Sequence, residues 1–176
     1  MKYDFFGALE AMAATLLRGT QCLADKPGER CLSECLEGAL ETDRRVCELE
    51  EALAGAFLPP LDRGDALALA HGLRQAVWCV YDTVYLLVRG RTTGGSEPLP
   101  TALPAAQAKA IGIAVGLLRH PAGAVFHPGT EQFYRTCYLA RHRRADSTAS
   151  RALTRLCEVL GVCYETAVET VMRAIG

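Results

Sequence analysis

Long stretches of helical periodicity, interrupted by short segments rich in proline and glycine, dominate this 176-residue sequence. Apolar residues recur at intervals of three and four, and the strict alternation that is typical of strands is nearly absent. The predicted helices cover six ranges, 3–23, 29–57, 63–88, 105–118, 130–144 and 148–175. The pattern therefore predicts an all-α protein, an antiparallel bundle of about six long helices.

The boundaries between these helices follow from residues that end or start a helix. The pair Pro59-Pro60 is expected to stop the second helix, and Asp62 is expected to cap the third. Residues 90–104 contain three glycines and three prolines, which is typical of a linker. We predict a single domain of residues 1–176, with a three-helix half at 1–89 and a second half at 105–176.

The charge balance argues against one class of partner. The chain has 19 Lys and Arg against 20 Asp and Glu, a net charge of −1, whereas a nucleic-acid binder is expected to be basic. Residues 1–88 carry a net charge of −6 and residues 89–176 a net charge of +5. Either the two halves complement each other within the bundle, which is the favoured interpretation, or one of them presents a charged patch to a partner.

The start of the chain and its hydropathy bear on location. No run of about 18 apolar residues is long enough to cross a bilayer. The segment MKYDFFGALE carries an acid and an amphipathic pattern instead of the apolar block of a signal peptide. We therefore expect a cytoplasmic protein.

The eight cysteines fit that expectation as reduced thiols. Most of them fall on apolar helix faces, where cysteine behaves as a small hydrophobic residue. Cys31 and Cys35 lie one helical turn apart and could share a metal ion. No second pair of Cys or His residues has a matching spacing, so two small core residues are the favoured interpretation.

Acidic residues on the second predicted helix suggest a possible metal site. Glu41 and Asp43 border its apolar stripe, and His71 and Asp82 on the third helix could face them. The favoured alternative is a solvated acidic edge beside an aromatic interface. Trp78, Tyr81 and Tyr85 would form that interface, as an oligomer face.

A basic cluster near residue 142 could bind an anion or an acidic partner. Its members are Arg141, His142, Arg143 and Arg144, and arginine and histidine can hold phosphate. A solvated helix end is the favoured alternative. The sequence contains no nucleophile elbow, phosphate-binding loop, dinucleotide fingerprint or His-Glu-x-x-His motif, so we expect no enzyme activity.

Several segments carry a resemblance to a known family. They read Phe5-Phe6-x-x-Leu9-Glu10-x-Met12-Ala13, then Glu41-Thr42-Asp43, then Phe57-Leu-Pro-Pro60-Leu-Asp62-Arg63-Gly-Asp65. They resemble the PhoU-like family of bacterial and archaeal helical proteins over residues 3–89. In the second half, only Ala145-Asp146 and the following Ser150-Arg151-Ala152-Leu153 are similar to the repeated segment of that family.

The resemblance implies a fold, a partner and a role. It implies two three-helix repeats, self-association into a homo-oligomer, and a non-enzymatic accessory or regulatory role in inorganic phosphate transport through contacts with a membrane transporter of the Pit type. The alternatives are a metal- or anion-binding bundle with a remnant carboxylate site, and a helical interaction module unrelated to phosphate.

The resemblance also implies a metal site that this sequence has largely lost. Acids of the family bind iron or zinc clusters, but Arg74, Gln75 and Trp78 stand at three of the acidic positions, and basic residues stand before Asp146. Guanidinium groups in place of carboxylates remove most of the attraction for a cation. We expect no cofactor, or at most one weakly bound Fe or Zn ion at Glu41, Asp43, His71 and Asp82.

Overall fold

The computed structural model describes residues 3–25, 27–90, 101–121 and 148–175. This part of the chain folds into five helices and contains no strand, which confirms the all-α class. They are α1 (Phe5–Ala24), α2 (Glu29–Gly55), α3 (Arg63–Arg89), α4 (Ala102–Leu117) and α6 (Thr148–Ile175). The helix predicted for residues 130–144 lies outside the described residues.

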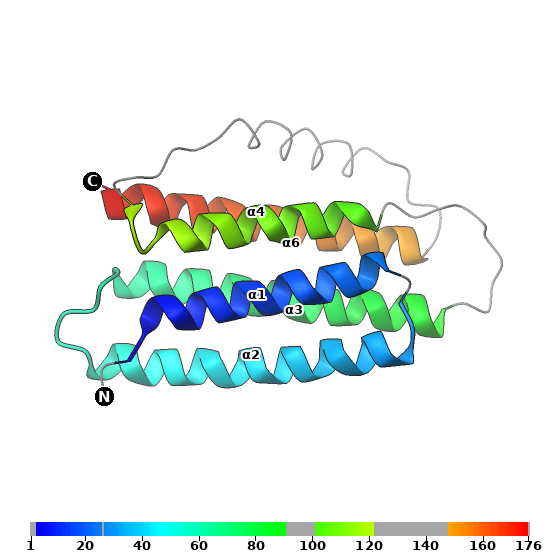
Figure 1. Ribbon diagram of the computed structural model, residues 1–176, viewed down its shortest axis with the longest axis horizontal. Helices are drawn as coiled ribbons and strands as arrows, with labels where there is room; N and C mark the ends of the chain where they lie inside the picture. Colours follow the sequence, from blue (N-terminus) through cyan, green and yellow to red (C-terminus); the bar gives the residue numbers. More distant parts are fainter. Residues whose placement is uncertain (1–2, 26, 91–100, 122–147, 176) are drawn as a thin grey trace.

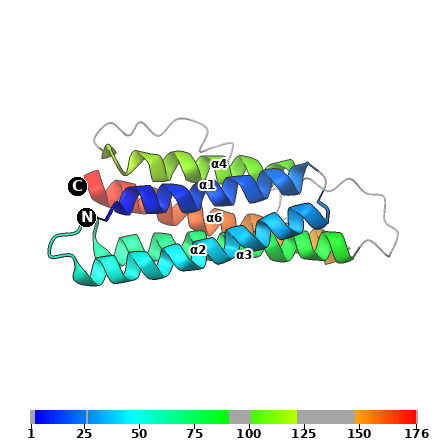
Figure 2. The ribbon, with the colours of Figure 1, turned by 60° about the horizontal axis from the view of Figure 1, so that its bottom comes forward.

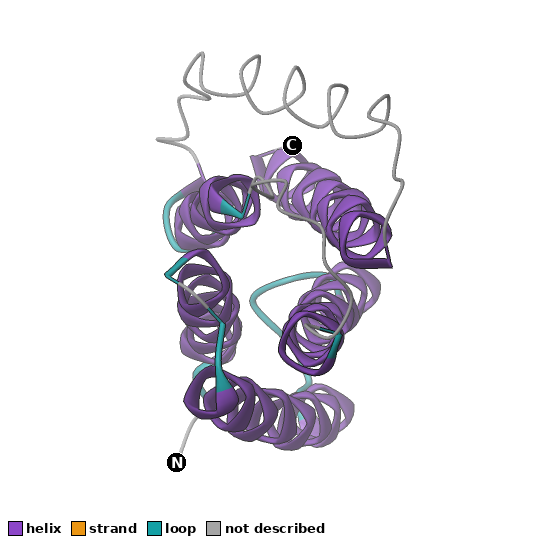
Figure 3. Cartoon of the chain, turned by 90° about the vertical axis from the view of Figure 1, so that its right-hand side faces the viewer, coloured by secondary structure: helices purple, strands orange, loops and turns teal. Residues whose placement is uncertain are grey.

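The helices run nearly parallel or antiparallel to one long axis and stack in layers (Figure 1). Helices α4 and α6 form one layer, α1 and α3 lie against it, and α2 covers the outer side of α1 and α3. The turned view in Figure 2 keeps α2 beside α3 along most of their length. Seen end-on, the described helices surround a common core (Figure 3).

The core is built from the apolar stripes that the sequence predicts. Leu9 and Leu16 of α1, Leu73 of α3 and Leu160 of α6 are completely buried. Each stripe must pack against a neighbouring helix, because burial of its apolar surface supplies most of the stability of an amphipathic helix. Arg119, just after α4, adds a polar link to α1 by pairing with Glu10 at 2.7 Å.

Several predicted helix ends agree with the structure and others need correction. Asp62 caps α3 as expected, because its Oδ1 accepts hydrogen bonds from the backbone N–H groups of Gly64 (2.8 Å) and Asp65 (3.2 Å). Helix α1 begins at Phe5, two residues later than predicted, where Asp4 caps it by accepting a hydrogen bond from Gly7 N–H. Helix α4 begins at Ala102 and not at 105, because proline is tolerated in the first turn of a helix.

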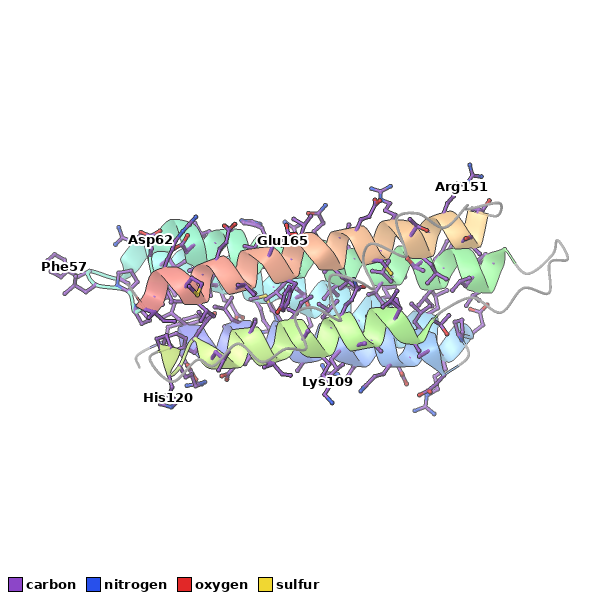
Figure 4. All side chains as sticks on the ribbon, turned by 90° about the horizontal axis from the view of Figure 1, so that it is seen from above. Phe57, Asp62, Lys109, His120, Arg151 and Glu165 are labelled. Carbon is purple, nitrogen blue, oxygen red and sulfur yellow. A yellow bond between two sulfur atoms is a disulfide. The ribbon has the colours of Figure 1, made fainter. Side chains whose placement is uncertain are left out.

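The end of α2 differs from the prediction in a way that changes a side chain's role. The helix stops at Gly55, so Phe57 is not part of the buried stripe and is 93% exposed. It projects from the α2–α3 loop beyond the end of the bundle (Figure 4). Pro59 disfavours the helical conformation at Leu58, so the helix is expected to end before this residue, and it does so at Gly55.

The expectation that the cysteines are reduced is wrong for one pair. Cys22, near the end of α1, forms a disulfide with Cys31 in the first turn of α2, with their Cα atoms 5.8 Å apart. The antiparallel turn between α1 and α2 brings these residues together, although they are nine positions apart in sequence. In the described part of the chain, no helix is long and apolar enough to cross a membrane.

Two glycines in helix interiors give opposite expectations for substitution by alanine. A Cβ at Gly38 would lie 2.8 Å from Thr15 Cγ2. That methyl group is held in place, because the Thr15 hydroxyl donates to Ala11 O and accepts from Arg18. A Cβ at Gly112 meets nothing within 4 Å.

We therefore expect Gly112→Ala to raise the free energy of unfolding by about 0.5–1 kcal/mol, since alanine loses less backbone entropy than glycine. Gly38→Ala overpacks the contact with Thr15, so this variant should be about 1–3 kcal/mol less stable than Gly112→Ala. Urea unfolding of both variants measures the difference. Equal stabilisation by the two substitutions would show that α1 and α2 are not packed this closely.

Candidate functional site

The face shared by α2 and α3 is the part of the described structure where most of the predicted site residues lie. The two helices are antiparallel, and a ladder of polar pairs fixes their register: Glu29 with Arg89 at 2.8 Å, Asp43 with Arg74 at 2.6 Å, and Glu50 with His71 at 3.1 Å. On α2, residues 29, 43 and 50 share a heptad spacing, so they lie along one side of the helix.

Asp43 occupies the centre of this ladder. Its Oδ1 accepts hydrogen bonds from Arg74 Nε at 2.6 Å and from Trp78 Nε1 at 3.0 Å. This carboxylate, a candidate metal ligand in the sequence, therefore accepts hydrogen bonds from two donors of α3.

Glu41 lies on the opposite flank of α2, in a groove between α1 and α2. It pairs with Arg44 at 2.7 Å and with Arg45 at 2.8 Å. The hydrogen bond from Arg44 lowers the pKa of the Glu41 carboxyl below its usual range. Glu41 and Asp43 are two residues apart, so they point to different sides of the helix and do not converge on one ion.

The two predicted ligands of α3 are also separate from each other. His71 contacts Glu50 at the far end of the ladder, and Asp82 lies three turns further along α3 on its exposed side. Within residues 3–25, 27–90, 101–121 and 148–175, no group of three or more His, Cys, Asp or Glu side chains is placed to hold a metal ion. The structure thus does not bring Glu41, Asp43, His71 and Asp82 together.

The three aromatic residues, by contrast, form a continuous row along α3. The Trp78 and Tyr81 rings meet edge to face with centroids 5.7 Å apart, and the Tyr81 and Tyr85 rings follow at 6.3 Å. Trp78 and Tyr81 are half-buried, whereas Tyr85 is 45% exposed. Such edge-to-face and tilted pairs hold the row in a defined arrangement.

Two leucines of α2, which are not among the predicted site residues, extend this row. Leu36 belongs to the heptad series of Glu29 and Asp43, and the register of the ladder places it opposite Tyr81 and Tyr85. Leu40 lies one turn further along α2 and is 55% exposed. We call Leu36, Leu40, Trp78, Tyr81 and Tyr85 the α2–α3 aromatic face.

A sequence signal for these leucines exists but is ambiguous. Leu36 and Leu40 lie at the edge of the apolar stripe of α2, where periodicity alone cannot separate a core position from an exposed one. The basic cluster Arg141, His142, Arg143 and Arg144 lies outside the described residues.

The pairing of Asp43 gives a testable prediction. Asp43→Ala should lower the free energy of unfolding by about 1 kcal/mol, since it removes a partly exposed ion pair and the acceptor for the indole N–H. Asp43→Asn keeps an acceptor and should cost less. Trp78 is the single tryptophan of the chain, so its fluorescence reports the change directly during urea unfolding.

The matched control is Glu51→Ala, at an exposed position of the same helix. This variant should unfold like the wild type. If Asp43→Ala also leaves the stability and the Trp78 emission unchanged, the link between α2 and α3 through Asp43 does not exist in solution.

Comparison with known proteins does not add a family to this geometry. No protein-family model matches the sequence, and a search of curated proteins finds no match either.

Proposed function

We propose that this protein is a PhoU-like, non-enzymatic accessory of inorganic phosphate transport, which acts by binding a membrane transporter of the Pit type through its α2–α3 aromatic face. The proposal combines the resemblance of residues 3–89 with the chemistry of this face. The bundle would consist of two three-helix repeats, and it would act by contact and not by turnover.

The observation that carries the proposal is that the Glu41 and Asp43 carboxylates are paired with donors of the chain itself. In a metal-binding member, Glu41 and Asp43 would be available to cations. Here Asp43 is hydrogen-bonded to Arg74 and Trp78, and Glu41 is paired with Arg44 and Arg45. These pairs use the carboxylates for structure, which favours a contact function over metal chemistry.

The exposed side chains support the same conclusion. Leu40 and Tyr85 present apolar and aromatic surface beside charged residues of the ladder. Partly exposed aromatic residues with a polar rim are typical of protein interfaces. Tyrosine and tryptophan also contribute much of the binding energy where they are buried by a partner.

The proposed location is the cytoplasm, where a transporter exposes its inner loops. Thiols in that compartment are usually reduced. In the proposed setting, the Cys22–Cys31 pair would therefore spend time as a dithiol.

Co-purification with a Pit-type transporter tests the proposal. The full chain and the transporter are co-expressed, the transporter is captured from detergent extract, and the amount of retained chain is measured. Leu40→Glu places a charge in the α2–α3 aromatic face and should reduce retention at least about tenfold, since desolvating an unpaired charge in an interface is costly. Tyr85→Glu should act in the same direction.

The matched control is Ile113→Glu on α4, because Ile113 is 60% exposed, close to the 55% of Leu40. This variant should be retained like the wild type. Size-exclusion chromatography with light scattering on the same variants shows whether the face binds a second copy instead. If the captured transporter retains no wild-type chain, and Leu40→Glu abolishes a dimer that the wild type forms, the proposal is contradicted and the face is assigned to self-association.

A further inference from the structure

Three cysteines lie near the turn from α1 into α2, and two of them are in direct contact. Cys22 lies near the end of α1, and Cys31 and Cys35 lie in the first two turns of α2. The Cα atoms of Cys22 and Cys31 are 5.8 Å apart, and residues four apart on a helix have Cβ atoms about 5–6 Å apart. In the sequence, Cys31 and Cys35 have no second pair of Cys or His residues at a matching spacing. The fold brings Cys22 of α1 next to Cys31.

The third cysteine faces the same stretch of α1. Cys35 is buried, and its Sγ lies 3.7 Å from the position that a Cβ on Gly19 would occupy. Gly19 precedes Cys22 by three residues, so it lies one turn away on the same side of α1. The lack of a side chain at Gly19 therefore allows the Cys35 sulfur to approach the part of α1 that carries Cys22.

A carboxylate completes the group. Glu34 Oε2 lies 4.0 Å from Cys22 Sγ. Glu34 also pairs with Arg30 at 2.7 Å, but the Arg30 side chain is 93% exposed, and such surface pairs contribute little. The Glu34 carboxylate can therefore move toward the sulfurs at small cost.

The group is reachable from solvent through two adjoining hollows. One, of about 370 Å³, is lined by Cys22, Glu34 and Cys35 among others, and also by Arg18. The other, of about 470 Å³, is lined by Cys22, Cys31 and Glu34, and by Arg18, Asp25 and Arg30 among the charged residues. An ion or a small reductant could thus reach Cys22 from outside without unfolding the bundle.

We propose that the reduced form of this protein binds one Zn²⁺ ion at the α1–α2 turn through the thiolates of Cys22, Cys31 and Cys35, with Glu34 as the neighbouring carboxylate. Three thiolates and one oxygen form a donor set that suits Zn²⁺, which prefers four ligands of this kind. In the structure, where Cys22 and Cys31 are bonded, no group of three or more His, Cys, Asp or Glu side chains in the described part of the chain is placed to hold a metal ion. Two sulfurs that are joined to each other cannot provide this donor set. The site is therefore available only after reduction.

The redox step balances with a low-molecular-weight dithiol as the reductant. The dithiol gives two electrons and two protons, the Cys22–Cys31 sulfur–sulfur bond breaks to give two thiols, and the dithiol becomes a cyclic disulfide. Zn²⁺ then replaces the three thiol protons, which leave to solvent, and three zinc–sulfur bonds form.

Titration of the full, tag-free chain with Cd²⁺ and Zn²⁺ tests the proposal. The protein is reduced with dithiothreitol, the reductant is removed anaerobically, and cadmium binding is followed by its thiolate-to-metal charge-transfer absorption. Zinc should displace the cadmium signal. Reduced wild type should bind about one ion per chain, as a single site of this donor set predicts, and oxidised wild type should bind none.

Serine variants separate this site from other thiols. Cys22→Ser and Cys31→Ser should abolish the absorption. Cys35→Ser should weaken the absorption. This variant can still form the Cys22–Cys31 disulfide, and formation of that disulfide shows that the variant folds. The control is Cys47→Ser, an exposed position of α2 outside the group, and it should bind like the wild type.

Equal binding by oxidised and reduced protein would overturn the proposal, as would full binding by Cys22→Ser. No binding by the reduced wild type would overturn it too. None of these outcomes depends on the transporter, so the two proposals fail or succeed separately.

Discussion

Leu73→Ala is expected to lower the free energy of unfolding by about 3 kcal/mol, within the range for leucine-to-alanine substitutions in protein cores. Leu73 is completely buried at the centre of α3. Its loss removes apolar burial and leaves a cavity that neighbouring helices cannot fill, since they are held at fixed spacing by their other contacts. For a chain of this length, the melting temperature should fall by roughly 6–12 °C.

Urea unfolding followed by circular dichroism measures this effect. The matched control is Leu58→Ala, in the α2–α3 loop, because Leu58 is 84% exposed and loses little contact on substitution. That variant should stay within about 0.5 kcal/mol of the wild type. Equal loss of stability at both positions would mean that α3 does not occupy the core.

Reduction of the Cys22–Cys31 disulfide is expected to cost about 2.5 kcal/mol of stability. The bond closes a loop across a sequence separation of nine, and the chain-entropy model gives a value of this order for so short a loop. Wild-type protein is unfolded in urea with and without dithiothreitol, in the presence of a chelator so that no metal compensates for the lost bond. The midpoint should fall when the reductant is present.

Cys22→Ser supplies the comparison for this experiment. It should have the stability of the reduced wild type and should not respond to dithiothreitol. Cys47→Ser should respond as the wild type does. If the reductant leaves the wild-type midpoint unchanged, Cys22 and Cys31 are not bonded in solution.

Features that depend on neighbouring residues in the sequence could be predicted well. The helical class follows from apolar periodicity, and the start of α3 follows from the Asp62 cap and the prolines before it. The buried stripes of α1 and α3 follow from the same periodicity. In each case, the cause lies within one or two turns of the residue concerned.

Features that depend on packing between helices could not be predicted from the sequence. Whether Asp43 is a metal ligand or the partner of Arg74 depends on the register of α2 against α3, which no local pattern sets. The Cys22–Cys31 bond depends on the turn between two helices. The exposure of Phe57 depends on where α2 ends, and helix ends are the least predictable part of a helix.

Uptake of radiolabelled phosphate by vesicles that contain a Pit-type transporter tests the central proposal most directly. The chain is added on the cytoplasmic side, and the initial rate is compared for wild type, Leu40→Glu and Ile113→Glu. We expect wild type and Ile113→Glu to change the rate equally, and Leu40→Glu to leave it at the value without added chain. An unchanged rate with wild-type chain, or equal effects of all three proteins, would contradict a regulatory contact through the α2–α3 aromatic face.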